Sequence, residues 1–158
     1  MNYKCIIFDC DGVLVDSEAI SNHMILDMVK KLGFEIDESY ATEHFSGTAL
    51  KSIFKYIEEV INQKLPSNFE NDFRKNTFEL LKTDLKPIKG IHNLLDKISI
   101  PVCVASSGLL EKIKLNLTTT RLLQYFDGNL FSCYDIGSWK PDPEIFLHAA
   151  KKNGIFTE

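Results

Sequence analysis

Residues 5–8, Cys-Ile-Ile-Phe, form an unbroken apolar run near the start of the chain, and the aspartates Asp9 and Asp11 follow it directly. An apolar run without alternation is typical of a parallel β-strand, because such strands are covered by helices on both faces of their sheet. We therefore predict a strand over residues 4–8, buried within a layered α/β fold.

The second half of the chain repeats this pattern. Residues 101–105 form a second continuous apolar run, and residues 130–132 form a third, shorter one. Helices are expected over residues 90–98, 109–117 and 141–153. This alternation of strand and helix predicts an α/β fold with a parallel, Rossmann-like sheet and right-handed crossovers.

Residues 16–85 separate the first two strands and contain no predicted strand. Apolar residues recur every four positions from Ile20 to Leu32, which is typical of an amphipathic helix. Further helices are expected over 37–45 and 50–61, and from Pro66 onward with an inner face of Phe69, Phe73, Phe78 and Leu81. We predict a discontinuous α/β core, residues 1–15 and 86–158, with an inserted helical domain of residues 16–85.

Composition makes several classes of protein improbable. The 158 residues carry a formal charge of 18 − 22 = −4, whereas a nucleic-acid-binding domain is more often basic. No stretch reaches the length of a membrane span, and the first residues lack a signal-peptide pattern. The four cysteines are scattered without a C-x-x-C pair, which favours free thiols in a reducing compartment. We expect a cytoplasmic protein that binds neither nucleic acid nor membrane.

Asp9 and Asp11 follow the first strand at its carboxyl end, where open parallel sheets bind ligands. Two neighbouring carboxylates repel each other unless a cation or a shared proton relieves the repulsion. Mg²⁺ prefers such oxygen ligands, one carboxylate can act as a nucleophile, and another can act as a general acid and base. Gly12 suits a sharp turn beside a ligand. The alternative is an acidic turn that only ends a strand.

Two other segments carry groups that suit a phosphate. Ser106 and Ser107 follow the second strand, where hydroxyls and the amides of a helix N-terminus can bind phosphate oxygens; the alternative is a plain helix cap. Lys140 lies between Trp139 and Pro141 in a segment stiffened by prolines. A lysine fixed there can neutralise a phosphate and a carboxylate together, and the alternative is a solvated surface lysine.

Together these motifs resemble those of the haloacid dehalogenase superfamily. That family has an apolar strand ending in D-x-D-G, a second strand ending in Ser or Thr, and a later lysine, often in K-P-x-P. The corresponding stretches here are F-D-C-D-G-V-L-V-D-S-E (8–18), V-A-S-S-G (104–108) and K-P-D-P (140–143). The inserted helices are similar to the small helical cap of the phosphatase and β-phosphoglucomutase branch.

The resemblance implies a Mg²⁺-dependent phosphatase that acts through an aspartyl phosphate. Asp9 would be the nucleophile, and Asp11 the general acid and base. Asp9 and Asp11 would also bind the metal, Asp11 through its backbone carbonyl. Ser106, Ser107 and Lys140 would hold the transferring phosphoryl group. Residues 100–104 and 134–140 also resemble bacterial phosphatases of the 6-phosphogluconate type, so we expect a small sugar phosphate or sugar-acid phosphate as substrate.

Two alternatives remain open. A β-phosphoglucomutase-like mutase would carry an arginine just after Gly47 and a histidine near position 21, where this chain has Thr48 and Ser21. The chain stops at Glu158, where the family's fourth motif, an acidic pair after a further strand, is expected. We therefore expect that the C-terminal part of the core is missing and that the first strand lies at a sheet edge. Because strand edges seek partners, a non-catalytic remnant that self-associates through this edge is the second alternative.

Overall fold

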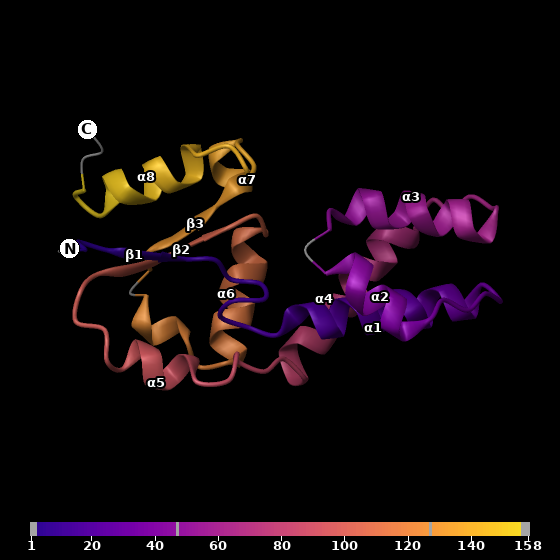
Figure 1. The fold of residues 1–158 in the computed structure, drawn as a ribbon, viewed down its shortest axis with the longest axis horizontal. Helices are drawn as coiled ribbons and strands as arrows, with labels where there is room; N and C mark the ends of the chain where they lie inside the picture. The colour runs from indigo at the N-terminus through magenta and orange to yellow at the C-terminus, as the bar shows by residue number, and fades with distance from the viewer. Residues whose placement is uncertain (1–2, 47, 127, 156–158) are drawn as a thin grey trace. The chain divides into compact units, whose positions relative to one another are not determined.

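A three-stranded parallel sheet lies at the centre of the α/β part of the computed structural model, which describes residues 3–46, 48–126 and 128–155 (Figure 1). Its strands are β1 (Ile6–Phe8), β2 (Val102–Ser106) and β3 (Leu130–Ser132), in the spatial order β1-β2-β3. The register pairs Phe8 with Val104 and Ser106 with Ser132. The residues that follow β1 therefore continue at the level of the end of β2. The predicted parallel α/β sheet is confirmed, whereas Gly47 and residues 156–158 lie outside the described residues.

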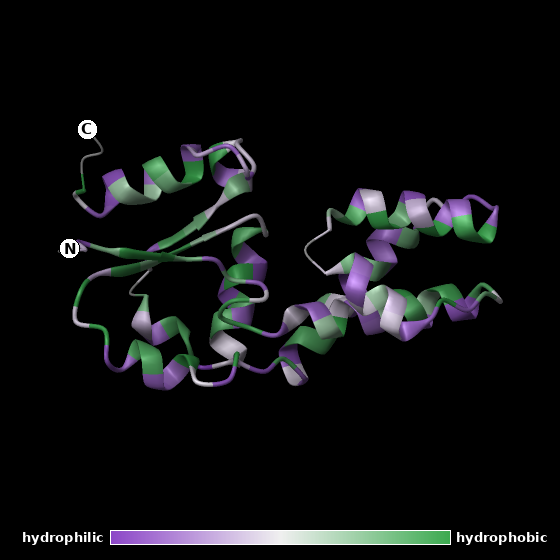
Figure 2. Cartoon of the chain, viewed as in Figure 1, coloured by the Kyte–Doolittle hydropathy of each residue, from purple (hydrophilic) through white to green (hydrophobic). Residues whose placement is uncertain are grey.

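The strands differ in burial. In β2, Cys103, Val104 and Ala105 are completely buried, as expected for a strand covered on both faces, and the strands are coloured as hydrophobic in Figure 2. All three residues of β1 are only partly buried. The first strand is therefore less buried than predicted, and it lies at an edge of the sheet within the described residues, as expected from the sequence.

Helices lie on both sides of the sheet, with α5 and α6 on one side and α7 and α8 on the other (Figure 1). Ala105 of β2 packs with Cys133 and Ile145 from the α7–α8 side. The bounds of these elements are α5 (Ile91–Leu95), α6 (Leu110–Thr119), a 3₁₀ turn (Leu123–Tyr125), α7 (Cys133–Ile136) and α8 (Glu144–Lys152). The 3₁₀ turn and α7 were not predicted, because segments of three or four residues are too short to show helical periodicity.

The start of α8 differs from its prediction. The helix was expected from residue 141 but begins at Glu144, whose backbone N–H donates to the Asp142 side chain at 2.9 Å. Prolines 141 and 143 have no N–H to donate, so regular helical hydrogen bonds begin only after them. Asp142 therefore has a local structural role at this helix start.

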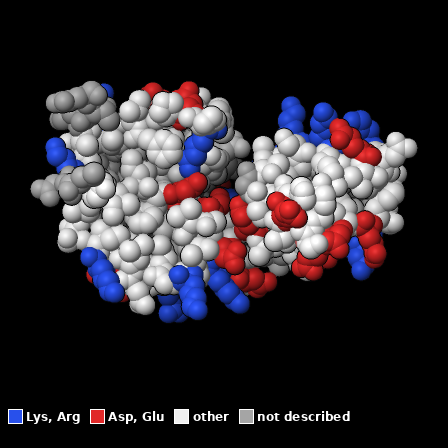
Figure 3. All heavy atoms as spheres, viewed as in Figure 1, with Lys and Arg blue, Asp and Glu red and all other residues white. Residues whose placement is uncertain are grey.

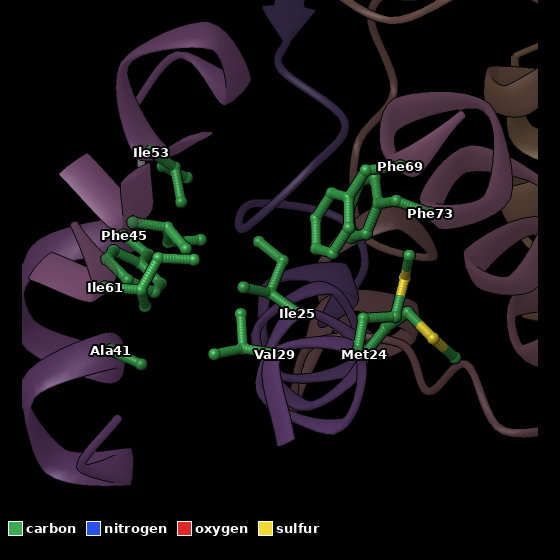
Figure 4. Close-up of a cluster of buried hydrophobic side chains, with 11 residues drawn as sticks. Met24, Ile25, Val29, Ala41, Phe45, Ile53, Ile61, Phe69 and Phe73 are labelled. Atoms are coloured by element: carbon green, nitrogen blue, oxygen red, sulfur yellow. The ribbon is translucent and has the colours of Figure 1, made fainter. Parts of the chain in front are cut away.

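The inserted segment folds into four helices around an apolar core (Figure 4). The labelled side chains Ile25, Val29, Phe45, Ile61 and Phe73 point toward one another in that view. The helices are α1 (Ser17–Lys31), α2 (Glu38–Phe45), α3 (Leu50–Ile61) and α4 (Phe69–Thr83). No helix in the described parts of the chain is long and apolar enough to cross a membrane.

The buried face of α4 differs from the expected one at a single position. Phe69, Phe73 and Leu81 are buried as expected, but Thr77 takes the place predicted for Phe78. The buried residues of this helix are spaced four apart, so they share one side of it. Phe78 follows Thr77 in the sequence and therefore lies on a neighbouring side of the helix. The Phe78 ring is instead covered by Lys82, whose Nζ lies 5.2 Å from the ring centroid.

Acidic and basic side chains both occur on the surface of the helical segment (Figure 3). Arg74 and Glu70 approach to 2.8 Å, and Lys55 and Glu59 to 3.8 Å, each pair one helical turn apart. Such exposed pairs stabilise a helix by only about 0.3–0.5 kcal/mol each. The stability of these helices therefore comes mainly from their shared apolar core.

The chain divides into two compact units. One consists of Met1–Asp16 with Leu85–Glu158, and the other of Ser17–Asp84. These limits lie within a residue of the domain limits expected from the sequence.

Two linkers connect the units, and they are hydrogen-bonded to each other. The Asp16 N–H donates to the Lys86 carbonyl at 2.9 Å, and the Ile88 N–H donates to the Leu14 carbonyl at 3.0 Å. The chain therefore leaves and re-enters the α/β unit through two adjacent, paired segments.

Candidate active site

A tight turn follows β1 and fixes the backbone of both aspartates. The Cys10 carbonyl accepts hydrogen bonds from the N–H groups of Leu14 and Val15, at 2.9 and 3.2 Å. Gly12 lies within this turn with φ of 73°, a conformation that residues with a Cβ rarely adopt. The turn therefore holds Asp9 and Asp11 close to the end of the strand.

Asp9 is held by two donors, one on each carboxylate oxygen. Its Oδ1 accepts from the Cys10 N–H at 2.7 Å, and its Oδ2 lies 2.7 Å from Lys140 Nζ. The Asp9 side chain is 42% exposed, and that of Lys140 is 22% exposed. Asp9 is thus accessible to a small ligand while Lys140 is partly buried beside it. Lys140 is further positioned by the ring of Phe146, 5.5 Å from its Nζ.

Asp11 is held by a different set of residues, which come from α6. Lys112 Nζ donates to Asp11 Oδ1 at 2.9 Å, and Asn116 Nδ2 donates to the same oxygen at 3.2 Å. The side chains of Lys112 and Asp11 are each 29% exposed, whereas Asn116 is completely buried. The two carboxylates that follow β1 are therefore paired with two separate lysines.

Ser106 ends β2 and is almost completely buried. Its Oγ accepts a hydrogen bond from the Gly108 N–H at 3.1 Å. A Cβ built on Gly108 would lie 3.5 Å from Ser106 Oγ and 3.7 Å from Asp11 Oδ2. Ser106 Oγ and the second oxygen of Asp11 thus both lie next to Gly108.

The loop after β2 is tied to the end of β3. Ser132 Oγ donates to the Gly108 carbonyl at 2.7 Å and accepts from the Tyr134 N–H at 3.1 Å. Ser107 is exposed on this loop, and the Cys133 thiol contacts its Oγ at 3.9 Å. The helix expected over residues 109–117 begins at Leu110, three residues after Ser107. Ser106 and Ser107 are therefore strand-end and loop residues, and neither caps a helix.

Cys10 separates the two aspartates and is completely buried. Burial, reinforced by the negative charge of Asp11, raises the pKa of the Cys10 thiol to about 12. The thiol is therefore neutral at physiological pH, and a neutral thiol is a poor nucleophile. Between Asp9 and Asp11, Cys10 acts as an apolar spacer that points into the core.

The oxygen donors at the end of β1 are of the kind that Mg²⁺ binds. No group of three or more His, Cys, Asp and Glu side chains is placed to hold a metal ion in the part of the chain that is described. Mg²⁺ is commonly held, however, by only one or two carboxylates together with substrate phosphate and water. Asp9 supplies one carboxylate at the strand end and the Asp11 backbone can add a carbonyl oxygen, and both are oxygen donors of the kind that Mg²⁺ binds.

The sequence predicted part of this arrangement. Asp9 and Lys140, which are far apart in the chain, are in direct contact as anticipated, and Ser106 Oγ and Asp11 Oδ2 both lie near Gly108. Lys112, Asn116 and Ser132 were missed. The signal that could have revealed Asn116 is its place between the apolar residues 113 and 117 on the inner side of a helix.

The sequence matches the haloacid dehalogenase-like hydrolase family over residues 6–158. Among curated proteins, the chain is 34% identical over 156 residues to the 6-phosphogluconate phosphatase of Escherichia coli (strain K12), covering 98% of this chain and 71% of that protein. It is 25% identical to hexitol phosphatase B of the same organism, covering 94% of this chain and 69% of that protein.

A solved structure shares both fold and sequence with the chain. This is a haloacid dehalogenase-like protein from Agrobacterium tumefaciens (strain C58), with a TM-score of 0.88 and 32% identity, over 98% of this chain and 70% of that one. The family model and this solved structure both match nearly all residues of the chain. The chain belongs to the haloacid dehalogenase-like hydrolase family.

Proposed function

We propose that the chain is a phosphoric monoester hydrolase that releases phosphate from a small phosphorylated metabolite through an aspartyl phosphate on Asp9. The observation that carries the proposal is the pairing of the two carboxylates with separate cations. Asp9 contacts Lys140 at 2.7 Å, and Asp11 contacts Lys112 at 2.9 Å. Groups in such different surroundings can take different roles in one reaction.

In the first step, a carboxylate oxygen of Asp9 attacks phosphorus and the bond from phosphorus to the ester oxygen breaks. Asp11, protonated at this stage, donates its proton to the departing oxygen, so the alcohol leaves neutral. Lys140 neutralises the charge on Asp9 and on the phosphoryl group that it receives. Ser106 and Ser107 are proposed as hydroxyl donors to the phosphoryl oxygens, since phosphoryl transfer depends chiefly on positioning and charge neutralisation.

In the second step, water attacks the phosphorus of the aspartyl phosphate. The Asp11 carboxylate takes a proton from this water, the bond from phosphorus to Asp9 breaks, and inorganic phosphate leaves. The Asp9 carboxylate is thereby restored, and Asp11 is again protonated for the next cycle. One residue serves as acid and then as base, so the two steps balance without any other proton carrier.

We further propose that Mg²⁺ binds at this strand end, held by the Asp9 side chain and the Asp11 backbone carbonyl. When bound, the ion would neutralise negative charge on the substrate phosphate. The number of protein ligands is small, which is normal for Mg²⁺ sites that include a substrate phosphate.

The names of the relatives support a sugar phosphate or sugar-acid phosphate as substrate. One relative is a 6-phosphogluconate phosphatase and another is a hexitol phosphatase. Both substrates are alkyl phosphate esters of polyhydroxylated chains. We therefore propose this chemical class for the chain.

The test is phosphate release from 6-phosphogluconate and hexitol phosphates with and without Mg²⁺, for the wild-type chain and for Asp9→Asn. The amide is close to the carboxylate in size but is a poor nucleophile, so phosphate release should fall below detection while the circular dichroism spectrum stays unchanged. Intact mass after acid quenching should show one added phosphoryl group on the wild type only. Turnover by Asp9→Asn near the wild-type rate would show that the nucleophile is assigned wrongly.

A further inference from the structure

Helix α6 presents two polar side chains to Asp11, and the proposed reaction steps leave both without a role. Lys112 and Asn116 are four residues apart, so they lie on the same side of the helix one turn from each other. Both donate to Asp11 Oδ1, at 2.9 and 3.2 Å. One carboxylate oxygen is therefore held at two points by a single rigid element.

Asn116 is an unusual residue for its position. It is completely buried, and its neighbours Ile113 and Leu117 on the helix are buried as well. Its Nδ2 meets Asp11, but its Oδ1 has no hydrogen-bond partner among the residues that the structure describes. The orientation of the amide follows from chemistry, because a carboxylate accepts hydrogen bonds and needs the N–H₂ end. A buried amide with an unpaired oxygen is destabilising, which points to a role for its donor end.

The attachment at Oδ1 decides where the other oxygen lies. Asp11 Oδ2 is 3.7 Å from the position of a Cβ on Gly108, and Ser106 Oγ is 3.5 Å from the same point. Holding Oδ1 against α6 thus turns Oδ2 toward the end of β2, where the phosphoryl group is proposed to bind. Lys112 does this without contacting Asp9, whose lysine partner is Lys140.

We propose that Lys112 and Asn116 are positioning residues that fix Asp11 so that its Oδ2 transfers the proton to the leaving oxygen. This inference rests on the proposed function of Asp11. Lys112 then serves proton transfer through Asp11, whereas Lys140 serves the phosphoryl group that Asp9 receives. Neither Lys112 nor Asn116 contacts substrate in this scheme, and both act through Asp11.

The test uses the dependence of the reaction on the leaving group. An alkyl phosphate needs a proton on its departing oxygen, whereas the nitrophenolate of p-nitrophenyl phosphate leaves readily without one. The quantity to measure is kcat/KM, which reports the steps up to phosphoryl transfer to Asp9. For Lys112→Met and Asn116→Leu, kcat/KM for 6-phosphogluconate should fall ~10-fold or more, because general acid catalysis contributes about 10²–10⁴-fold. For p-nitrophenyl phosphate, kcat/KM should fall less than about 3-fold, since the departure of nitrophenolate depends little on proton transfer from Asp11.

Two matched variants serve as controls. Lys114→Met removes an exposed lysine from the same helix and should leave kcat/KM unchanged for both substrates. Lys112→Arg keeps a donor for Asp11 Oδ1 and should recover most of the activity toward 6-phosphogluconate. Equal losses for the two substrates would mean a merely structural role and would overturn the proposal, as would a Lys112→Met variant that behaves like Lys114→Met.

Crystal structures of the wild type and of both variants give a second readout that does not depend on activity. We expect Asp11 Oδ2 to turn away from Ser106 and Gly108 when Lys112 or Asn116 is replaced. An unchanged Asp11 rotamer in both variants would overturn the positioning role. If the wild type hydrolysed neither ester, the proposed function would fail, and the rotamer comparison would still decide whether these residues orient Asp11.

Discussion

Lys140 and Lys64 make ion pairs of almost equal length, yet they should differ greatly in their effect on activity. Lys140 Nζ lies 2.7 Å from Asp9 Oδ2 with its side chain 22% exposed, and Lys64 Nζ lies 2.6 Å from Glu58 Oε2 with its side chain 88% exposed. Lys140→Ala should lower kcat/KM about 10²-fold or more, because it removes a fixed cation from the transferring phosphoryl group. Lys64→Ala should change kcat/KM less than about 2-fold, since an exposed pair contributes little.

Steady-state assays of both lysine variants with 6-phosphogluconate give the comparison. Small, equal effects would contradict the placement of Lys140.

The cysteines should differ in their reactivity toward thiol reagents. Burial raises the pKa of Cys10, and also that of Cys103, to about 12. A raised thiol pKa favours the protonated form, so at pH 8 these thiols are essentially unreactive. Cys5 is the partly exposed cysteine of the four and should react first with Ellman's reagent. Peptide mapping after brief labelling identifies the site, and early modification of Cys10 in the folded protein would contradict this assignment.

Single residues also show where sequence reasoning stops. Asp9 and Asp11 could be predicted because two neighbouring carboxylates follow an apolar strand, and the later serine and lysine motifs favour a ligand site over an acidic turn. Lys112 could not, because a lysine on a helix is normally solvated and its partner Asp11 lies 101 residues away in the chain. Contacts between residues so far apart in the chain depend on how strands and helices pack, and a local sequence pattern does not predict them.

Among the helices, α3 allows a direct comparison of a buried and an exposed aliphatic residue. Ile57 is completely buried in the core of the helical unit, whereas Val60 is 49% exposed. Ile57→Ala should lower the free energy of unfolding by about 2–5 kcal/mol, since it removes buried methyl groups and leaves a cavity. Val60→Ala should lower it by less than about 0.5 kcal/mol. Urea denaturation followed by far-ultraviolet circular dichroism measures both, and a similar loss for the two variants would show that α3 does not bury the face assigned to it.

The helices and strands were predicted with unequal success, and the reasons are physical. The helices α1, α2, α3 and α6 begin and end close to their expected limits, because a spacing of three to four residues between apolar positions persists over several turns. The starts of α4 and α8 and the limits of α5 were less accurate. Prolines, side-chain caps and short elements decide those limits, and such features act over only one or two residues.

For the molecule as a whole, the edge of the sheet is the feature that most affects behaviour in solution. Ile6 donates its N–H to the Pro101 carbonyl of the segment before β2, so the N–H of Ile7 points away from β2 because successive amides alternate in direction. We expect self-association through this edge, visible as a concentration-dependent sedimentation coefficient.

Two substitutions at one position test this expectation. Ile7→Pro removes the outward N–H together with the side chain that packs near Ala105 and Ile145. Ile7→Ala removes the packing but keeps the N–H. The proline variant should therefore be the more monomeric of the two at equal concentration. Identical sedimentation of both variants and the wild type across a wide concentration range would exclude association through β1.

The paired linkers on either side of the helical unit affect how this unit can be replaced by the corresponding segment of another protein. Leu14 and Asp16 are hydrogen-bonded to Ile88 and Lys86, so both ends of the segment 17–84 are anchored at one short stretch of the α/β unit. A graft of another helical block between Asp16 and Leu85 would therefore not need to shift the register of β1 against β2. The paired linkers therefore allow the helical unit to be exchanged as one segment while the sheet and the strand-end carboxylates stay in place.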